Sequence, residues 1–157
     1  METLDFDGRR FIVARATESD VPALAALLAD DVLGAQREST DMERYAAAFR
    51  EIDLDPNNFL ATVRDAQAKL VGTLQLTLIP GLSRGGTKRL QIEGVRLASS
   101  TRGTGLGTAL LEWAHEYGRR HGASLSQLTT DKTRTGAHRF YDSLGYQATH
   151  AGYKRPL

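Results

Sequence analysis

The stretch LQIEGVRLASSTRGTGLGTALL, Leu90–Leu111, decides the fold of this chain, because it joins a strand pattern to a glycine-rich loop and a helix pattern. Up to Glu93, apolar and polar residues alternate, which is typical of a strand with one buried face. After Gly94 the apolar positions are Val95 and Leu97, so the alternation shifts by one residue. The shift predicts a β-bulge at Gly94 that absorbs one extra residue. A strand buried on both faces is the alternative.

A loop of small residues, Ser99–Gly107, follows this strand and leads into apolar residues at helical spacing, among them Leu106, Leu110 and Trp113. A strand, a glycine-rich loop and a helix in this order offer free backbone N–H groups and a positive dipole end to a phosphate. Arg102 adds a cation to the loop. The spacing differs from the dinucleotide and P-loop motifs. We therefore predict a phosphate-binding loop of another kind, with a plain connection as the alternative.

Composition narrows the class of protein. The 157 residues are enough for one domain, predicted to span 1–157, and a 41% hydrophobic and 25% charged content is ordinary for a globular protein. A net charge of +1 predicts neither a nucleic-acid nor a membrane partner. The chain has no cysteine, no long apolar run and an acidic start unlike a signal peptide, so we expect a cytoplasmic protein.

The order of patterns along the chain predicts an α/β fold, in which a mixed sheet is covered by helices. A capping box of Thr40 and Glu43 is expected to open the second helix. The predicted strands are 11–16, 59–64, 70–79, 90–97, 124–130 and a final antiparallel pair, 146–150 with 152–157; the predicted helices begin near 17, 40, 106 and 137, and the third is broken by the glycines of 118–122.

Two segments resemble the hallmarks of the GNAT N-acetyltransferase superfamily. Arg102, Gly105 and Gly107 match its R-x-x-G-x-G acyl-coenzyme A signature, and Ala137–Tyr146 resembles its A-x-x-F/L-Y-x-x-x-G-F/Y helix. The resemblance covers essentially the whole chain. It implies a GNAT-like mixed central β-sheet with a bulged, splayed central strand, flanked by about four helices. It also implies acetyl-CoA as co-substrate.

Two side chains are candidate catalytic groups. Glu93 precedes the proposed bulge on the polar side of the strand, where many GNAT enzymes place a general base; a surface glutamate paired across strands is the alternative. Tyr141 occupies the tyrosine position of the second motif, and the resemblance implies that it is the general acid. Without the resemblance, Tyr141 is expected to be a core aromatic residue.

The resemblance also implies a coenzyme site. The backbone of the strand after the bulge is expected to bind the pantetheine arm as an added strand does, with an N–H near Val95 as oxyanion donor. His138 is expected to line the coenzyme groove, or else to be an exposed helix histidine. Lys132, Arg134 and Arg139 form either phosphate contacts or a solvated basic loop; Arg134 replaces an asparagine that is frequent in the family. The remaining candidates are Val95, Arg96 and Leu97 for the arm, and Arg102, Gly103, Thr104, Gly105, Leu106, Gly107 and Thr108 for the pyrophosphate.

Three functions remain open at this point. The first is acetyl transfer to a primary amine of a small molecule, with an acceptor pocket formed by 32–42, 81–87 and the final strands. The second is acetylation of a protein N-terminus or lysine, and the third is a non-catalytic acyl-CoA sensor. The four histidines lack metal-ligand spacing, so no metal is expected. A homodimer is possible for such proteins, but no residue pattern marks an interface.

Overall fold

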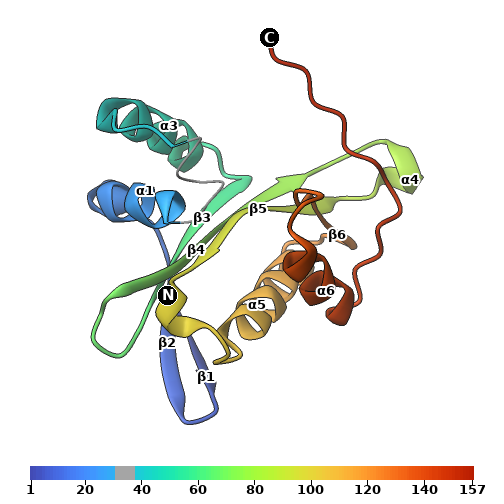
Figure 1. Cartoon of the computed structure of the whole chain (residues 1–157). Coiled ribbons are helices and arrows are strands. Elements are labelled where there is room, and N and C mark those ends of the chain that lie inside the picture. The colour runs from blue at the N-terminus through green and yellow to red at the C-terminus, as the bar shows by residue number, and fades with distance from the viewer. Residues whose placement is uncertain (31–37) are drawn as a thin grey trace. The chain divides into compact units, whose positions relative to one another are not determined.

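A computed structural model describes residues 1–30 and 38–157 of the chain (Figure 1). The described residues form two compact units, Met1–Gln127 and Leu128–Leu157. The first unit contains the sheet, the glycine-rich loop and all but one of the described helices. The second contains one helix and an extended C-terminal segment.

The mixed sheet has six strands in the order β1-β2-β3-β4-β5-β6, so each strand lies beside its neighbours in the sequence. Strands β1 to β5 pair in antiparallel fashion. The first strand, which the sequence analysis missed, pairs with the second across a tight turn at Asp7 and Gly8, both with positive φ. The strands are β1 Glu2–Phe6, β2 Arg9–Arg15, β3 Asn58–Arg64, β4 Leu70–Ile79, β5 Arg89–Leu97 and β6 Leu125–Leu128.

The predicted bulge lies in β5. Gln75 of β4 is opposite Glu93, whereas Thr73, two residues earlier on β4, is opposite Arg96, three residues further along β5. One residue of β5 is therefore extra, and Gly94 takes a φ of 60°, a conformation that glycine adopts without the strain of a Cβ. The shift in apolar phase thus predicted the bulge correctly.

Helices cover both faces of the sheet (Figure 1). Helices α1 and α3 pack on one face and α5 on the other. Asp41, rather than the predicted Thr40, caps α3, because its carboxylate accepts the backbone N–H of Arg44. The helical elements are η1 Glu18–Asp20, α1 Val21–Ala29, α3 Met42–Leu54, α4 Ser83–Gly86, η2 Ser99–Thr101, α5 Leu106–Arg120 and, in the second unit, α6 Thr135–Ser143.

The main core lies between α5 and the sheet. Leu110 and Leu111 of α5 are fully buried, as are Leu90 and Ile92 of β5. Helix α5 continues through Gly118, where a break was predicted, because the glycine lets the helix approach the strand: a Cβ there would lie 3.0 Å from Leu90 Cδ2. The predicted helix break at Gly118 is therefore wrong, and this glycine allows close packing instead.

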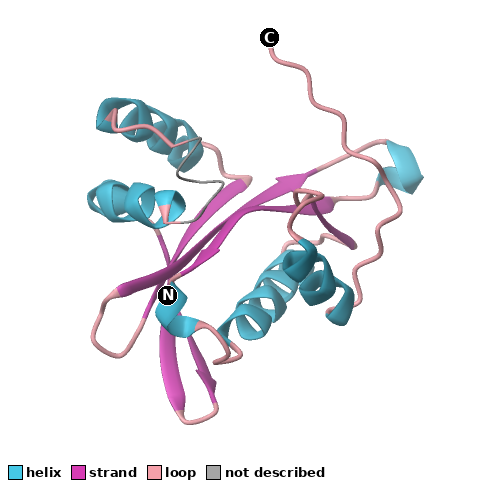
Figure 2. Ribbon diagram, viewed as in Figure 1, coloured by secondary structure: helices cyan, strands magenta, loops and turns pink. Residues whose placement is uncertain are grey.

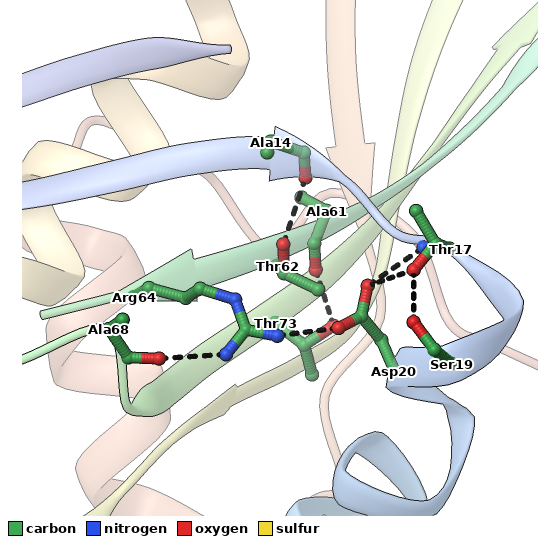
Figure 3. Close-up of polar contacts among 9 residues, drawn as sticks. All are labelled: Ala14, Thr17, Ser19, Asp20, Ala61, Thr62, Arg64, Ala68 and Thr73. Atoms are coloured by element: carbon green, nitrogen blue, oxygen red, sulfur yellow. Dashed lines mark hydrogen bonds and ion pairs between the residues drawn. The ribbon is translucent and has the colours of Figure 1, made fainter.

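A polar junction fixes the start of α1 to the hairpin of β3 and β4 (Figure 3). Arg64 donates to the carboxylate of Asp20 and, at 2.8 Å, to the backbone carbonyl of Ala68 in the hairpin turn. Asp20 also accepts from the backbone N–H and the hydroxyl of Thr17 at 2.8 and 2.9 Å. Burial alone would raise the pKa of Asp20, but the hydrogen bonds from Thr17 and Arg64 outweigh it and lower the pKa below its usual range.

The predicted final pair of strands is wrong. Residues 146–157 form neither helix nor strand and are drawn as loop in Figure 2. Their backbone hydrogen bonds are local, such as that from Tyr146 N to Tyr141 O. The segment 147–152 holds no large apolar residue, so an added strand there would bury little surface.

Candidate active site

The loop between β5 and α5 presents backbone N–H groups at the start of a helix. Gly103 and Gly105 have φ values of 72° and 82°, a conformation that side chains rarely tolerate. Helix α5 starts at Leu106, whose N–H is held by the hydroxyl of Thr104 at 3.3 Å. The first intrahelical backbone bond is made by Ala109, so the next N–H groups of the first turn are available to a ligand.

Those available donors belong to Gly107 and Thr108, and Arg102 lies at the entrance of the same loop. Backbone donors, the helix dipole and a guanidinium each favour negative charge. The predicted loop residues thus lie in one continuous turn of backbone, between η2 and the first turn of α5.

The register of β5 orients Glu93. Residues directly opposite in an antiparallel pair project from the same face, so Glu93 stands on the same face as Gln75. Gln75 lines a cavity beneath α1 and α3, as does Gly94 of the bulge. Glu93 is exposed. The carboxylate is therefore on the face that carries the cavity, beside the bulge and away from the packed face under α5.

The bulge interrupts the pairing of β5 with β4 over a short stretch. Gly94 and Val95 have no opposite residue on β4, whereas Arg96 and Leu97 are again in register with Thr73 and Gly72. The carbonyl of Val95 accepts from the guanidinium of Arg96 at 2.9 Å. The gap in the ladder to β4 is thus confined to two residues.

The cavity has a volume of about 130 Å³ and a largely apolar lining. No residue of the predicted 81–87 loop is among its lining, and of the predicted 32–42, residues 32–37 lie outside the described part of the chain. The apolar wall is formed by side chains of α1, α3 and β3: Leu24, Leu28, Ala48, Phe49, Ile52 and Leu60.

A chain of hydrogen bonds at the edge of the cavity fixes the amide of Gln75. Asn58 Nδ2 donates to Asp55 Oδ2 at 2.6 Å, and Asn58 Oδ1 accepts from Gln75 Nε2 at 2.9 Å and from Thr77 Oγ1 at 2.8 Å. The backbone N–H of Asn57 lowers the pKa of Asp55 below its usual range; the side-chain amides of Asn58 and Asn57 add to this against the opposing effect of burial. Asp55 is therefore an acceptor near neutral pH.

An ionised carboxylate accepts hydrogen bonds only, so it determines the orientation of each amide that follows. The NH2 group of Asn58 must face Asp55, and its carbonyl must face Gln75. The NH2 group of Gln75 then faces Asn58, which leaves its Oε1 as an acceptor for another donor. Gln75 was not predicted as a site residue, because its partner Asn58 is 17 positions away and no local pattern links the two.

Comparison with known proteins now identifies the family. The profile of the Acetyltransferase (GNAT) family matches residues 23–146. The chain belongs to the GNAT acetyltransferase family. It is similar to the aminoalkylphosphonate N-acetyltransferase of Salmonella typhimurium strain LT2, with 29% identity over 143 residues that make up 90% of this chain and 88% of that protein. As a member of this family the protein is an acyltransferase, and acetyl-CoA is the family's acyl donor.

Solved structures share the GNAT fold. A structure titled as a transcriptional regulator from Bacillus halodurans C-125 is 43% identical, with a TM-score of 0.88 and coverage of 94% of this chain and 99% of that one. The glucosamine-6-phosphate N-acetyltransferase of Arabidopsis thaliana is 19% identical, with a TM-score of 0.75 and coverage of 94% and 98%. The second likeness concerns the fold alone.

The second GNAT motif lies on α6 in the C-terminal unit. Tyr141 packs there against Phe140 and Tyr146, with ring centroids 5.3 and 5.9 Å apart. Gly145 ends the helix with a φ of 83°, as its position in the motif predicts. The ring of His138 makes a 2.9 Å hydrogen bond through Nε2 with the backbone carbonyl of Asp131.

Trp113 is part of the core, since it is buried beside Phe59 of β3, with ring centroids 5.8 Å apart. Among residues 1–30 and 38–157, no three or more His, Cys, Asp or Glu side chains gather as metal ligands do. In the same part of the chain no helix has the length and apolar character needed to cross a membrane.

Proposed function

We propose that this GNAT enzyme transfers the acetyl group of acetyl-CoA to the primary amine of a small molecule by direct attack. The observation that carries the proposal is the bulge, because it brings together an unpaired stretch of backbone, Glu93 and a cavity on one face of the sheet. The anion-binding loop after the same strand supports a coenzyme with a pyrophosphate. Acetyl-CoA supplies the acetyl group as a thioester.

The residues divide the proton transfers between them. An alkylammonium has a pKa near 10, as lysine does, so it must lose a proton before its nitrogen attacks. Glu93 accepts that proton, directly or through water, and passes it to solvent. An N–H at Val95 stabilises the negative charge that develops on the carbonyl oxygen. As the N–C bond forms and the C–S bond breaks, Tyr141 donates a proton to the sulfur and regains one from the new amide nitrogen.

Other residues are proposed to bind the coenzyme. In the proposed complex, Val95, Arg96 and Leu97 bind the pantetheine arm and His138 lines its groove. The loop from Arg102 to Thr108 binds the pyrophosphate. The positive φ values of Gly103 and Gly105 support this role, since the backbone N–H groups there have no side chain in front of them.

The curated relative is named for aminoalkylphosphonates. A phosphonate is anionic and calls for a cation beside it, but the described residues that line the cavity include no Lys, Arg or His. The cavity lining by itself thus offers no cation to a phosphonate, although Arg96 stands on the same face, opposite Thr73, and 2-aminoethylphosphonate is therefore tested with the other amines.

The deciding experiment measures thiol release from acetyl-CoA in the presence of alkylamines, 2-aminoethylphosphonate, amino acids, aminoglycosides and short peptides. We expect release that depends on a small amine. Peptide-dependent release would instead favour protein acetylation. Tight acetyl-CoA binding without release on any acceptor would favour an acyl-CoA sensor.

The coenzyme half of the proposal has its own test. The change Gly105→Val places a β-branched residue at a φ of 82°, so the loop must distort and acetyl-CoA binding should weaken at least about tenfold. Calorimetric titration measures this, with Gly152→Val in the C-terminal segment as the control. Unchanged binding would remove the loop from the coenzyme site.

A further inference from the structure

Two features on the face of the sheet that carries Glu93 are able to contact the amine substrate. One is the oriented carbonyl of Gln75, directly opposite Glu93 in the strand register. The other is the apolar cavity, to which Gln75 also contributes. Because Cβ atoms of opposite residues are about 5 Å apart, a single amine nitrogen is able to reach both side chains.

The cavity selects the rest of the acceptor by size. Its volume of about 130 Å³ is close to that of a protein cavity of about 150 Å³, lined by Leu, Ile and Phe, that stays dry and binds benzene. A single ring, or a branched chain of about four or five carbons, is of this size. A larger substituent would exceed the cavity.

The lining also selects by charge. The wall contributed by α1 and α3 consists of aliphatic side chains, Phe49 and Tyr45. A carboxylate, phosphonate or second ammonium placed in it would be desolvated without a partner of opposite charge among the lining residues, which costs far more than an uncharged group does. Apolar burial, by contrast, contributes favourably with each buried CH2.

From these observations, and resting on the proposed acetyl transfer, we infer that the acceptor is a primary amine with one compact, uncharged apolar group. The apolar group occupies the cavity beneath α1 and α3, and the Oε1 of Gln75 accepts a hydrogen bond from the amine. Gln75 is thus a specificity-determining residue, held in orientation by Asp55 through Asn58. Glu93 on the opposite strand takes the proton from the same nitrogen.

The first test compares amines that differ in one property. Benzylamine and 3-methylbutylamine carry the predicted group, methylamine lacks it, and β-alanine and 1,4-diaminobutane carry a second charge. We expect kcat/KM for benzylamine to exceed the values for β-alanine and 1,4-diaminobutane by at least tenfold. A preference for either charged amine would overturn the inference and leave the transfer reaction intact.

The second test fills the cavity. Ala48 lines the cavity from α3 and is solvent-exposed, so Ala48→Leu reduces the volume without disturbing the core. We expect KM for benzylamine to rise about tenfold, as the loss of roughly two buried CH2 groups implies, while KM for methylamine stays within twofold. Ala47→Leu, one position earlier and outside the lining, is the matched control. Equal effects of Ala48→Leu on both amines would contradict the inference.

The third test concerns the carbonyl of Gln75. Gln75→Leu removes the acceptor but keeps most of the volume, so kcat/KM should fall about tenfold for methylamine and benzylamine alike. This independence of amine size distinguishes an amine-orienting residue from a cavity wall. Acetyl-CoA affinity and Tm are measured on the same variant; if the loss of activity followed a loss of either, the role assigned to Gln75 would be wrong.

A binding measurement separates this inference from the proposed function. Benzylamine is titrated calorimetrically into the protein saturated with coenzyme A. Binding that Ala48→Leu weakens and Ala47→Leu does not would support the site even if no amine were acetylated, in which case only the proposed reaction would fail. Absence of benzylamine binding at millimolar concentration would overturn the site itself.

Discussion

The two faces of the sheet are formed by the same strands and differ in how they are packed. On the face under α5, Leu74, Leu76 and Ile92 are fully buried, as is Leu110 of the helix. Under α1 and α3, the same strands present Thr73, Gln75 and other polar residues beside a cavity of about 130 Å³. Side chains alternate between the faces along each strand, so one residue in two is free to take a role other than core packing.

The bulge keeps apolar residues of β5 on the face under α5 and polar residues on the face under α1 and α3. Without the extra residue, Leu97 would project from the same face as Glu93, and Arg96 from the face under α5. With it, Leu97 returns to the packed side, where it fills the space above Gly72. We call the face under α5, with Leu74, Leu76 and Ile92, the packed face, and the face with Thr73, Gln75 and Glu93 the hollow face. The packed face determines stability, while the hollow face is available for recognition.

The largest change that this comparison predicts is a fall in the acetylation rate when Glu93, on the hollow face, is replaced. Glu93→Gln should lower the acetylation rate at pH 7 by about 10²- to 10⁴-fold, which is the usual contribution of a general base. The loss should shrink as the pH approaches 10, because the amine is then neutral without help from the enzyme. Initial rates between pH 6 and 10 measure this.

Stability and coenzyme affinity of Glu93→Gln should equal those of the wild type, since the side chain is exposed. Glu112→Gln, an exposed glutamate on α5 and thus on the other face, serves as the control and should leave the rate unchanged. A pH-independent effect of Glu93→Gln, or no effect, would remove the carboxylate from the mechanism.

The packed face should respond in the opposite way, with a large change in stability. Leu110→Ala deletes a fully buried side chain and should lower the free energy of unfolding by about 2–5 kcal/mol. Leu28→Ala, on the wall of the cavity, should cost about 1 kcal/mol or less, because Leu28 is only half-buried and already borders empty space. Urea unfolding measures both. Equal losses would show that the hollow face is as tightly packed as the other.

Much of the fold follows from local patterns. The bounds of β4, Leu70–Ile79, coincide with the prediction, because the alternation of Thr73 to Leu78 marks a strand that ends at a Pro-Gly pair. The bulge was also predictable, since one extra residue in a strand shifts the apolar phase and a glycine accommodates it readily. The missed strand β1 had a local mark as well, the Asp7-Gly8 pair between alternating segments, which typically indicates a hairpin.

The rest of the site depends on contacts between distant segments. The orientation of Gln75 is determined at Asp55, 20 positions earlier, through hydrogen bonds that exist only when β3 and β4 pair. The cavity requires α1 and α3 to pack beside each other on the sheet, and neither helix has a sequence pattern that distinguishes its cavity wall from ordinary core. The phosphate-binding loop was predicted from its own residues, and Glu93 was placed by its position before the bulge with support from the family resemblance. The identity of the coenzyme and the role of Tyr141 came from the resemblance. All of these roles stay predictions until the variants are measured.

The smallest effect concerns the junction that holds α1 over the hollow face (Figure 3). The side chain of Asp20 is only 12% exposed and its pKa is lowered in the folded state, so its ionised form stabilises the fold above the pKa of the unfolded chain. That contribution is lost as the pH falls through the lower, folded-state pKa. Asp20→Asn should therefore cost about 1–2 kcal/mol at pH 7, and the difference from wild type should decrease in acid.

Urea unfolding of Asp20→Asn at pH 7 and at several values below pH 5 tests this junction. Asp5→Asn is the control, because the Asp5–Arg10 pair is more than half exposed on both sides and should contribute nothing measurable. A second consequence links the junction to the cavity: α1 forms one wall, so weakening its attachment should raise KM for benzylamine more than for methylamine. If both amines respond equally, or the stability loss does not change with pH, the Asp20–Arg64 pair does not hold the cavity in shape.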